Sequence, residues 1–125
     1  MREHDPNVSI GLISNARGAT AIEEWMPGTR YYREALERVR AARDTGVLKG
    51  VLWHQGEGND ADPDYHIKLK KLIAQMRKDL GNENLFFVAG GIVDTDEYPR
   101  GKIINPQMAR LPREVPSTGF ASSEG

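Results

Sequence analysis

The chain has 125 residues, of which 38% are hydrophobic and 28% are charged, and its formal net charge at neutral pH is -1. This length and composition are typical of one globular domain, and the near-zero charge gives no reason to expect nucleic acid or a membrane as a partner. The chain contains no cysteine, which excludes disulfides and thiolate metal sites. It has no stretch close to the roughly 20 apolar residues of a membrane span, and its start lacks the apolar run of a signal peptide. We therefore expect a soluble chain, while an export signal in a longer precursor would precede Met1.

The first half of the chain predicts two strands with a helix between them. Residues 8–14 and 47–53 are short apolar runs of the kind that form buried strands. Residues 31–46 carry apolar side chains at helical spacing, and Gly46 is a natural helix stop. This segment therefore predicts an amphipathic helix with a charged outer face.

The second half continues the alternation with the strongest helical pattern in the chain. Asp62 suits the N-cap of a helix and Pro63 suits its first turn, and Gly81 ends the pattern. One apolar stripe runs along this predicted helix and consists of Tyr65, Leu69, Leu72, Ile73, Met76 and Leu80. Residues 85–92 then predict a third strand.

The C-terminal part predicts one more helix and one more strand. Residues 103–111 form a short helical pattern in which Asn105 would be the cap and Pro106 the first-turn residue, and residues 118–123 predict a short strand. Strands that alternate with helices imply right-handed crossovers and a mostly parallel sheet covered on both faces. The sequence therefore predicts an α/β fold, a three-layer α/β/α sandwich.

Polar residues follow two of the predicted strands. The loop NARGAT, residues 15–20, follows the first strand, and HQGEGND, residues 54–60, follows the second. The carboxyl ends of parallel strands meet at one edge of a sheet, so these loops should converge. Gly18 would let a backbone N–H approach a ligand closely, and Gln55 offers an amide donor on a rigid base. Together they would stabilise a developing oxyanion, as in an acyl-transfer site.

Simpler explanations exist for the same residues. Gly18 can serve a turn, Gln55 can hydrogen-bond a loop, and His54 can be a satisfied core group. A nucleotide-binding half-domain is disfavoured because Ala61 stands where the third glycine of a dinucleotide loop belongs. His54 and His66 lie near acidic residues, but no helical His pair or calcium-loop pattern is present, so a solvated acidic loop explains them better than a metal site.

The block GVLKGVLWHQGEGND resembles the signature of the SGNH-hydrolase relatives grouped as carbohydrate esterase family 6 and the sialate O-acetylesterases, in which a strand ends in Trp-His-Gln-Gly-Glu. VSIGLISNARGATAIEEWMPG and YHIKLKKLIAQMRKDLG are similar to the family's preceding strand and following helix. The resemblance implies an SGNH/flavodoxin-like sandwich and serine-dependent removal of acetyl groups from sugars such as acetylxylan or sialic acid. It also implies that neither a metal nor an organic cofactor is needed.

Carried onto this chain, the resemblance makes Gln55 the side-chain donor and Gly18 the backbone donor of an oxyanion hole. His54 and Glu57 would support the loop without taking part in the chemistry. The family often has two glycines in the first block, whereas here Gly18 is followed by Ala19.

The family's other catalytic blocks have no counterpart here. Its nucleophile lies in a Gly-x-Ser-Asn block before residue 8, and its histidine lies in an Asp-x-x-His block that would begin about where this chain stops. We therefore assign no nucleophile and expect residues 1–125 to be a single domain, incomplete at both ends. Such a chain should be unstable alone, and its expected partners are an acetylated carbohydrate and a complementing chain or a second copy. The alternative is a catalytically inactive carbohydrate-binding or interaction module on the same scaffold.

Overall fold

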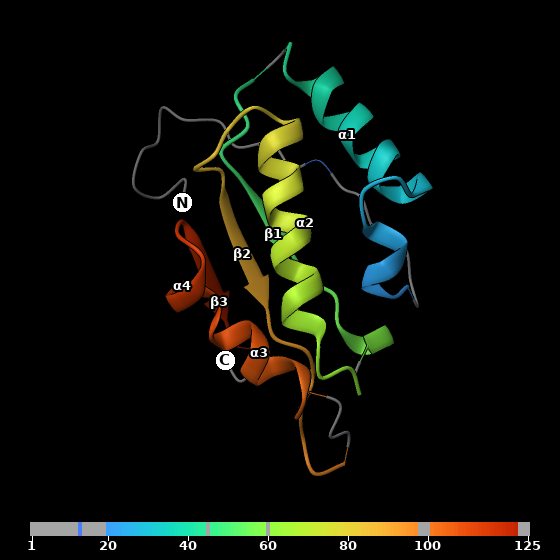
Figure 1. Ribbon diagram of the computed structural model, residues 1–125, viewed down its shortest axis with the longest axis vertical. Helices are drawn as coiled ribbons and strands as arrows, with labels where there is room; N and C mark the ends of the chain where they lie inside the picture. Colours follow the sequence, from blue (N-terminus) through green and yellow to red (C-terminus); the bar gives the residue numbers. More distant parts are fainter. Residues whose placement is uncertain (1–12, 14–19, 45, 60, 98–100, 123–125) are drawn as a thin grey trace.

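The computed structural model describes residues 13, 20–44, 46–59, 61–97 and 101–122 (Figure 1). Its 3₁₀ helices are η2 (Ile22–Trp25) and η3 (Glu57–Asn59). Its α-helices are α1 (Arg30–Ala42), α2 (Tyr65–Asp79), α3 (Ile104–Ala109) and α4 (Leu111–Glu114), and its strands are β1 (Gly50–Trp53), β2 (Phe86–Gly90) and β3 (Thr118–Ala121). Within the described residues, no helix has the length and apolar character needed to cross a membrane.

The three strands form one parallel sheet in the order β1-β2-β3. Val51 lies opposite Phe87 in the first pair, and Val88 lies opposite Gly119 in the second. The predicted α/β fold with a parallel sheet is therefore confirmed, as are the strands predicted around β1, β2 and β3. The strand predicted at residues 8–14 lies outside the described residues except for Ile13, which has no regular secondary structure.

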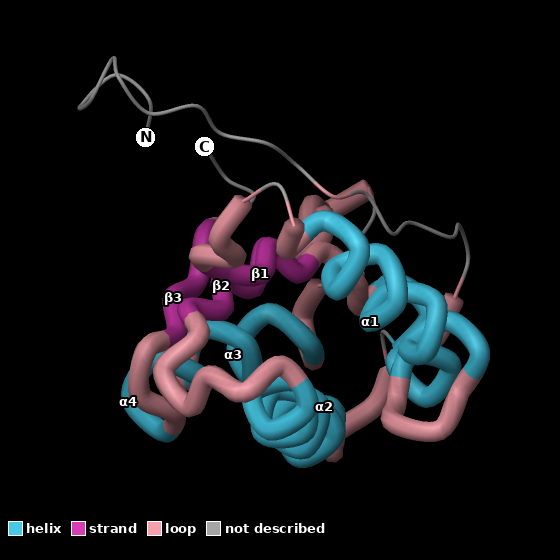
Figure 2. Tube along the Cα trace, turned by 90° about the horizontal axis from the view of Figure 1, so that it is seen from above, coloured by secondary structure: helices cyan, strands magenta, loops and turns pink. Residues whose placement is uncertain are grey.

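The helices that connect the strands lie on one face of the sheet. Figure 2 shows α2, α3 and α4 together on the same side of the three strands, while α1 lies beyond β1 on the side away from β2. Right-handed crossovers that advance in one direction along a sheet place their helices on the same face, and both crossovers here run from β1 towards β3. The described residues thus supply one of the two helical layers that the sequence predicts.

The other face of the sheet is apolar and exposed. Leu52 is 69% exposed in the middle of β1, and Phe86 is 47% exposed at the start of β2. On the opposite face, Val51, Trp53 and Phe87 pack into the core. The fully buried part of that core is formed by Ile22, Tyr32, Tyr65, Leu69, Leu72, Ile73, Phe87, Ala89, Ile92, Ile104, Met108 and Leu111.

Helix α2 carries the predicted apolar stripe, but it begins at Tyr65 rather than after Asp62. Asp62 Oδ1 accepts from the backbone N–H of Asp64 at 2.9 Å, which makes a turn one step before the helix. The first turn of α2 is satisfied from elsewhere, because the N–H of His66 donates to Gln107 Oε1 at 2.8 Å. The N-cap prediction for Asp62 is therefore wrong, whereas the predicted stop at Gly81, with a φ of 69°, is confirmed.

Asn105 also differs from its prediction. It lies inside α3, whose N-cap is Ile103. Its side chain instead accepts from the N–H of Ile92 and donates to the carbonyl of Ile92, each at 2.9 Å. Asn105 therefore fastens the segment after β2 to α3 and does not cap the helix.

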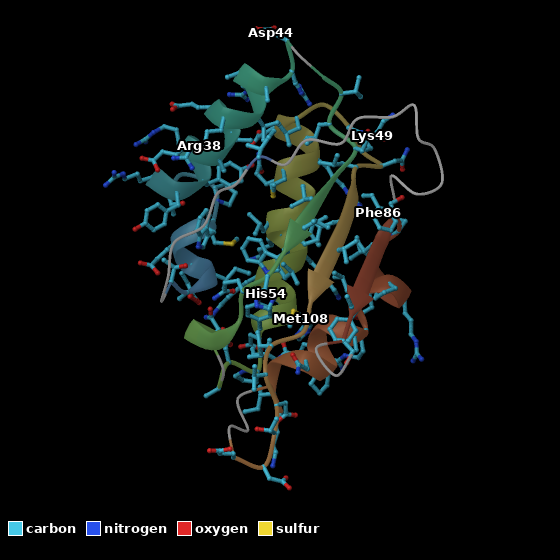
Figure 3. All side chains as sticks on the ribbon, turned by 180° about the vertical axis from the view of Figure 1, so that it is seen from behind. Arg38, Asp44, Lys49, His54, Phe86 and Met108 are labelled. Carbon is cyan, nitrogen blue, oxygen red and sulfur yellow. The ribbon has the colours of Figure 1, made fainter. Side chains whose placement is uncertain are left out.

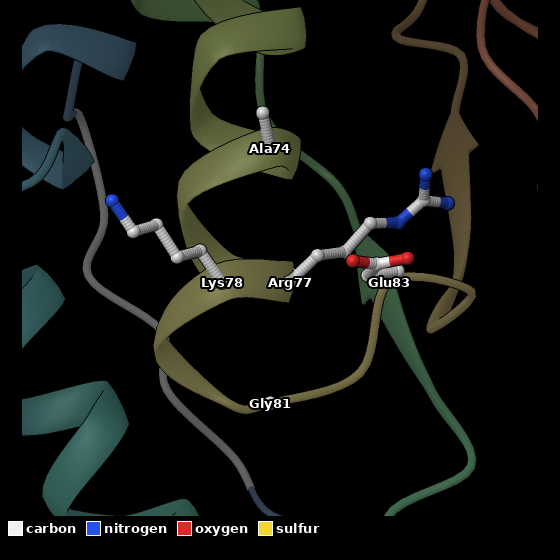
Figure 4. Close-up of a pocket in the computed structure, with 5 residues that line it drawn as sticks. All are labelled: Ala74, Arg77, Lys78, Gly81 and Glu83. Carbon is white, nitrogen blue, oxygen red and sulfur yellow. The ribbon is translucent and has the colours of Figure 1, made fainter.

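The amino-terminal edge of the sheet is fastened by Arg77. Its guanidinium donates to the carbonyl of Leu85 at 3.1 Å, of Pro116 at 2.8 Å and of Ser117 at 3.0 Å. Burial lowers the pKa of Arg77. Figure 4 shows the open pocket beside it, which is lined by Ala74, Arg77, Lys78, Gly81 and Glu83.

The exposed sheet face generates a prediction about association. Replacing Leu52 by Lys should shift the purified chain towards monomer, because contiguous exposed apolar surface drives association. Light scattering coupled to size-exclusion chromatography over a range of concentrations measures this. Ile67→Lys is the matched control, since Ile67 is an exposed apolar residue, 45% exposed, on α2. A wild-type chain that is a monodisperse monomer at every concentration would contradict the prediction.

Candidate functional site

The candidate site lies where β1 ends and the chain turns into η3. Figure 3 shows His54 at the carboxyl end of β1, far from Lys49 and Phe86 at the other end of the sheet. The turn needs glycine at position 56, where φ is 153° and an added Cβ would lie 3.0 Å from Ile104 and 3.1 Å from Ile92. The loop after β1 is therefore packed against both α3 and the segment that follows β2.

Gln55 is buried at the centre of this site, with 8% of its surface exposed. Its amide nitrogen donates to the carbonyl of Thr20 at 2.9 Å and to Asn59 Oδ1 at 3.0 Å. Its amide oxygen accepts from the hydroxyl of Tyr65 at 2.7 Å. Both ends of the side-chain amide are thus hydrogen-bonded, and the side chain is held from three directions.

The contact with Thr20 bears on the predicted convergence of the two loops. Thr20 is the last residue of NARGAT, so this end of the first loop does meet Gln55. The approach is close, because a Cβ added to Gly58 would lie 2.6 Å from the carbonyl oxygen of Thr20. Gly18 itself lies outside the described residues. The oxyanion roles of Gln55 and Gly18 remain predictions.

Asn59 is a central site residue that the sequence did not reveal. It is 8% exposed, and its amide oxygen accepts from the backbone N–H of Ile22 at 2.7 Å. Its amide nitrogen donates to both carboxylate oxygens of Glu23 at 3.0 Å. One feature of the sequence could have indicated it. Asn59 directly follows Gly56-Glu57-Gly58, where two glycines allow a tight turn that returns the next side chain to the strand end.

Aromatic side chains close the inner side of the site. The indole N–H of Trp53 donates to the hydroxyl of Tyr65 at 2.9 Å, and that of Trp25 donates to Thr20 Oγ1 at 2.8 Å. The two indoles meet edge to face, with ring centroids 6.4 Å apart. Phe87 also contacts Trp53, with ring centroids 6.1 Å apart. Gln55 itself is buried, so its hydrogen bonds lie away from bulk water.

Charged residues form the outer end of the site. Lys68, on α2, donates to Glu23 Oε1 at 2.8 Å and to Asp62 Oδ2 at 2.5 Å. These hydrogen bonds lower the pKa of both Glu23 and Asp62, and the bond to Asp62 is the largest cause of the raised pKa of Lys68. The carboxylate of Glu23 therefore stays ionised while it accepts from Asn59.

His54 and Glu57, the two residues predicted to support the site, lie just after β1 and in η3. His54 is exposed, and a Cβ added to Gly90 would lie 3.2 Å from its Nδ1, so the glycine makes room for the imidazole. Glu57 is the first residue of η3. Their supporting roles remain predictions. Among the described residues, no group of three or more His, Asp and Glu side chains is arranged to hold a metal ion.

Comparison with known proteins identifies the family to which this chain belongs. The family model described as "Carbohydrate esterase, sialic acid-specific acetylesterase" matches residues 1–125. The chain belongs to this family of carbohydrate esterases, and the resemblance seen in the Trp-His-Gln-Gly-Glu block is confirmed.

Two comparisons with Arabidopsis thaliana give the extent of the similarity. The chain is 34% identical over 94 residues to the protein described as "Probable carbohydrate esterase At4g34215", which covers 71% of this chain and 36% of that protein. The X-ray structure of the Arabidopsis thaliana protein AT4G34215 superposes with a TM-score of 0.72 at 27% identity, covering 86% of this chain and 46% of the other. The chain thus spans less than half the length of either.

The ion pairs of Lys68 generate a prediction about pH. The pKa values of Glu23 and Asp62 lie below their ordinary values of 4.5 and 3.8. Their ion pairs with Lys68 therefore stabilise the folded chain above these ordinary values, and this stabilisation is lost as the pH falls through the lower pKa values of the folded state. Lys68→Met should therefore lower the free energy of unfolding at neutral pH, and this difference from wild type should shrink below pH 3.8. Urea denaturation at several pH values measures it. Lys71→Met is the control, because Lys71 is exposed on the same helix, and a pH-independent difference for Lys68→Met would count against the assignment.

Proposed function

We propose that this chain carries the oxyanion-binding part of a carbohydrate O-acetylesterase, a serine ester hydrolase that removes acetyl groups from sugars such as acetylxylan or sialic acid. Family membership supports ester hydrolysis of a carbohydrate. The observation that carries the proposal is the buried amide of Gln55, whose donor end faces Thr20 at the carboxyl edge of the sheet. Ligands of open parallel sheets bind at this edge.

In the proposed reaction, Gln55 acts on the charge that develops on the substrate. Attack of a serine hydroxyl on the acetyl carbonyl gives a tetrahedral intermediate with a negative oxygen. The amide nitrogen of Gln55 and the backbone N–H of Gly18 would donate to that oxygen. The serine and its histidine base would come from the Gly-x-Ser-Asn and Asp-x-x-His blocks, which this chain does not match.

The hydrogen bond from Gln55 to Thr20 would make this donation selective for the transition state. The carbonyl of Thr20 and the ester carbonyl of a bound substrate are both neutral acceptors. They therefore compete on similar terms for the amide hydrogen of Gln55. A hydrogen bond to a full negative charge is about twice as strong, so the oxyanion would displace or share the bond more effectively than the substrate. Stabilisation that appears mainly in the transition state raises the rate of the chemical step.

One observation favours a second candidate function, a catalytically inactive carbohydrate-binding or interaction module. Both donor hydrogens of Gln55 already have acceptors within the chain, at Thr20 and Asn59. A glutamine saturated in this way can serve as a purely structural link between two loops.

Complementation separates the two functions. We expect the chain alone to release no measurable acetate from a chromogenic acetate ester or an acetylated xylan. A second polypeptide that supplies the Gly-x-Ser-Asn and Asp-x-x-His blocks should rescue hydrolysis. Gln55→Ala should then lower the rescued kcat by about 10²- to 10³-fold, the usual cost of removing one oxyanion donor.

Gln75→Ala is the matched control for this experiment. Gln75 donates to Asp79 on the outer part of α2, so its removal should leave the rescued rate near wild type. A rescued rate that is equally insensitive to Gln55→Ala would overturn the proposal. Tight binding of the sugar without any rescue would instead favour the inactive module.

A further inference from the structure

The hydrogen bonds around Gln55 have a direction that its neighbours determine. The indole N–H of Trp53 can only donate, so the hydroxyl oxygen of Tyr65 accepts from it at 2.9 Å. The single hydroxyl proton of Tyr65 is then directed to Gln55, with the amide oxygen at 2.7 Å and the backbone carbonyl at 3.1 Å. The acceptor end of the Gln55 amide therefore faces Tyr65.

The far side of Gln55 is ordered by the same logic. The backbone N–H of Ile22 can only donate, and the carboxylate of Glu23 can only accept, so the oxygen of Asn59 faces Ile22 and its nitrogen faces Glu23. The oxygen of Asn59 is then the group that accepts from Gln55 at 3.0 Å. The bonds form one continuous series, from Trp53 through Tyr65, Gln55 and Asn59 to Glu23.

We infer that Tyr65 is a positioning residue that holds the Gln55 amide with its donor end towards Thr20 and strengthens it as a donor. This inference rests on the proposed function of Gln55. A hydroxyl that donates to an amide oxygen draws electron density from the amide and makes its N–H groups better donors. Tyr65 suits this role because it is fully buried in the core and lies at the start of α2, so its ring cannot move away.

The role becomes important when a substrate oxygen replaces the carbonyl of Thr20. That carbonyl helps to orient the amide when no substrate is bound, and its hydrogen bond is the one that an oxyanion would take. Tyr65 contacts the opposite end of the amide, so its hydrogen bond persists during this exchange. Gln55 would then keep its orientation while its donor changes partner.

Tyr65→Phe tests the inference, with Tyr32→Phe as the matched control. Tyr32, on α1, is also a buried tyrosine whose hydroxyl donates to a side-chain oxygen, but its partner is Asp79, at the opposite end of α2 from Tyr65. In ¹⁵N-labelled chain, Tyr65→Phe should shift the side-chain amide resonances of Gln55 upfield and increase the exchange rate of its Nε2 hydrogens by about tenfold or more, as expected for the loss of a buried hydrogen bond. Tyr32→Phe should leave both unchanged. In the complemented esterase, Tyr65→Phe should lower kcat by about 3- to 10-fold with little effect on KM.

Trp53→Phe provides a second variant that leaves the tyrosine in place. It removes the first donor of the series, so it should shift the Gln55 resonances in the same direction by a smaller amount. Unchanged Gln55 resonances in a folded Tyr65→Phe chain would overturn the positioning role, whatever the activity. A second outcome separates the two claims. If the Gln55 resonances shift as expected but the rescued activity does not depend on Gln55, the hydrogen-bonding role of Tyr65 stands and the proposed function of Gln55 is overturned.

Discussion

Two buried side-chain amides, those of Gln55 and Asn59, hold the carboxyl edge of the sheet together. Gln55 binds the end of the NARGAT loop through Thr20, and Asn59 binds the start of η2 through Ile22. A buried polar group left without a partner costs about 1–3 kcal/mol, and a domain is stable by only about 5–15 kcal/mol. Loops that are distant in the sequence are therefore coupled at this edge, because moving either one would leave several buried groups unpaired.

The opposite edge is held by a different chemistry. Arg77 contributes a buried guanidinium that hydrogen-bonds backbone carbonyls just before β2 and β3, and desolvation lowers its pKa. The middle of the sheet is held by apolar contacts between the strands and α2. The core and the amino edge thus fix the strands, and the carboxyl edge carries polar donors and acceptors that pair with one another. A preorganised donor on a rigid strand end is the kind of group that stabilises charge without a reorganisation cost.

Patterns of apolar residues in the sequence were sufficient to predict the three described strands and the two longer helices, whereas the strand predicted at residues 8–14 is untested. Five of the six residues in the predicted stripe are buried and Met76 is partly buried, because apolar residues spaced three to four apart share the buried face of a helix. The caps were less predictable. Asp62 and Asn105 both occupy positions that suit a cap, yet Asp62 makes a local turn with the N–H of Asp64 and Asn105 binds the backbone of Ile92. Neither hydrogen bond leaves a periodic signal in the sequence.

The sequence predicted part of the candidate site and missed the part that depends on tertiary hydrogen bonds. Gln55 was identified from its position after a strand and from a motif, whereas Asn59 was missed because its partners, Ile22 and Glu23, are far from it in the sequence. Tyr65 was assigned to the apolar stripe. That assignment is right for its ring, but periodicity carries no information about where a buried hydroxyl donates.

Hydrogen exchange of the Ile22 backbone amide tests the coupling of the two loops most directly. Ile22 is fully buried, and its N–H donates to Asn59 Oδ1 at 2.7 Å. We expect this amide to be strongly protected in the wild-type chain and to exchange about tenfold to a hundredfold faster in Asn59→Ala, with Asn84→Ala, an exposed asparagine, unchanged. Rapid exchange of Ile22 in the wild-type chain, or protection that survives the loss of Asn59, would contradict the account.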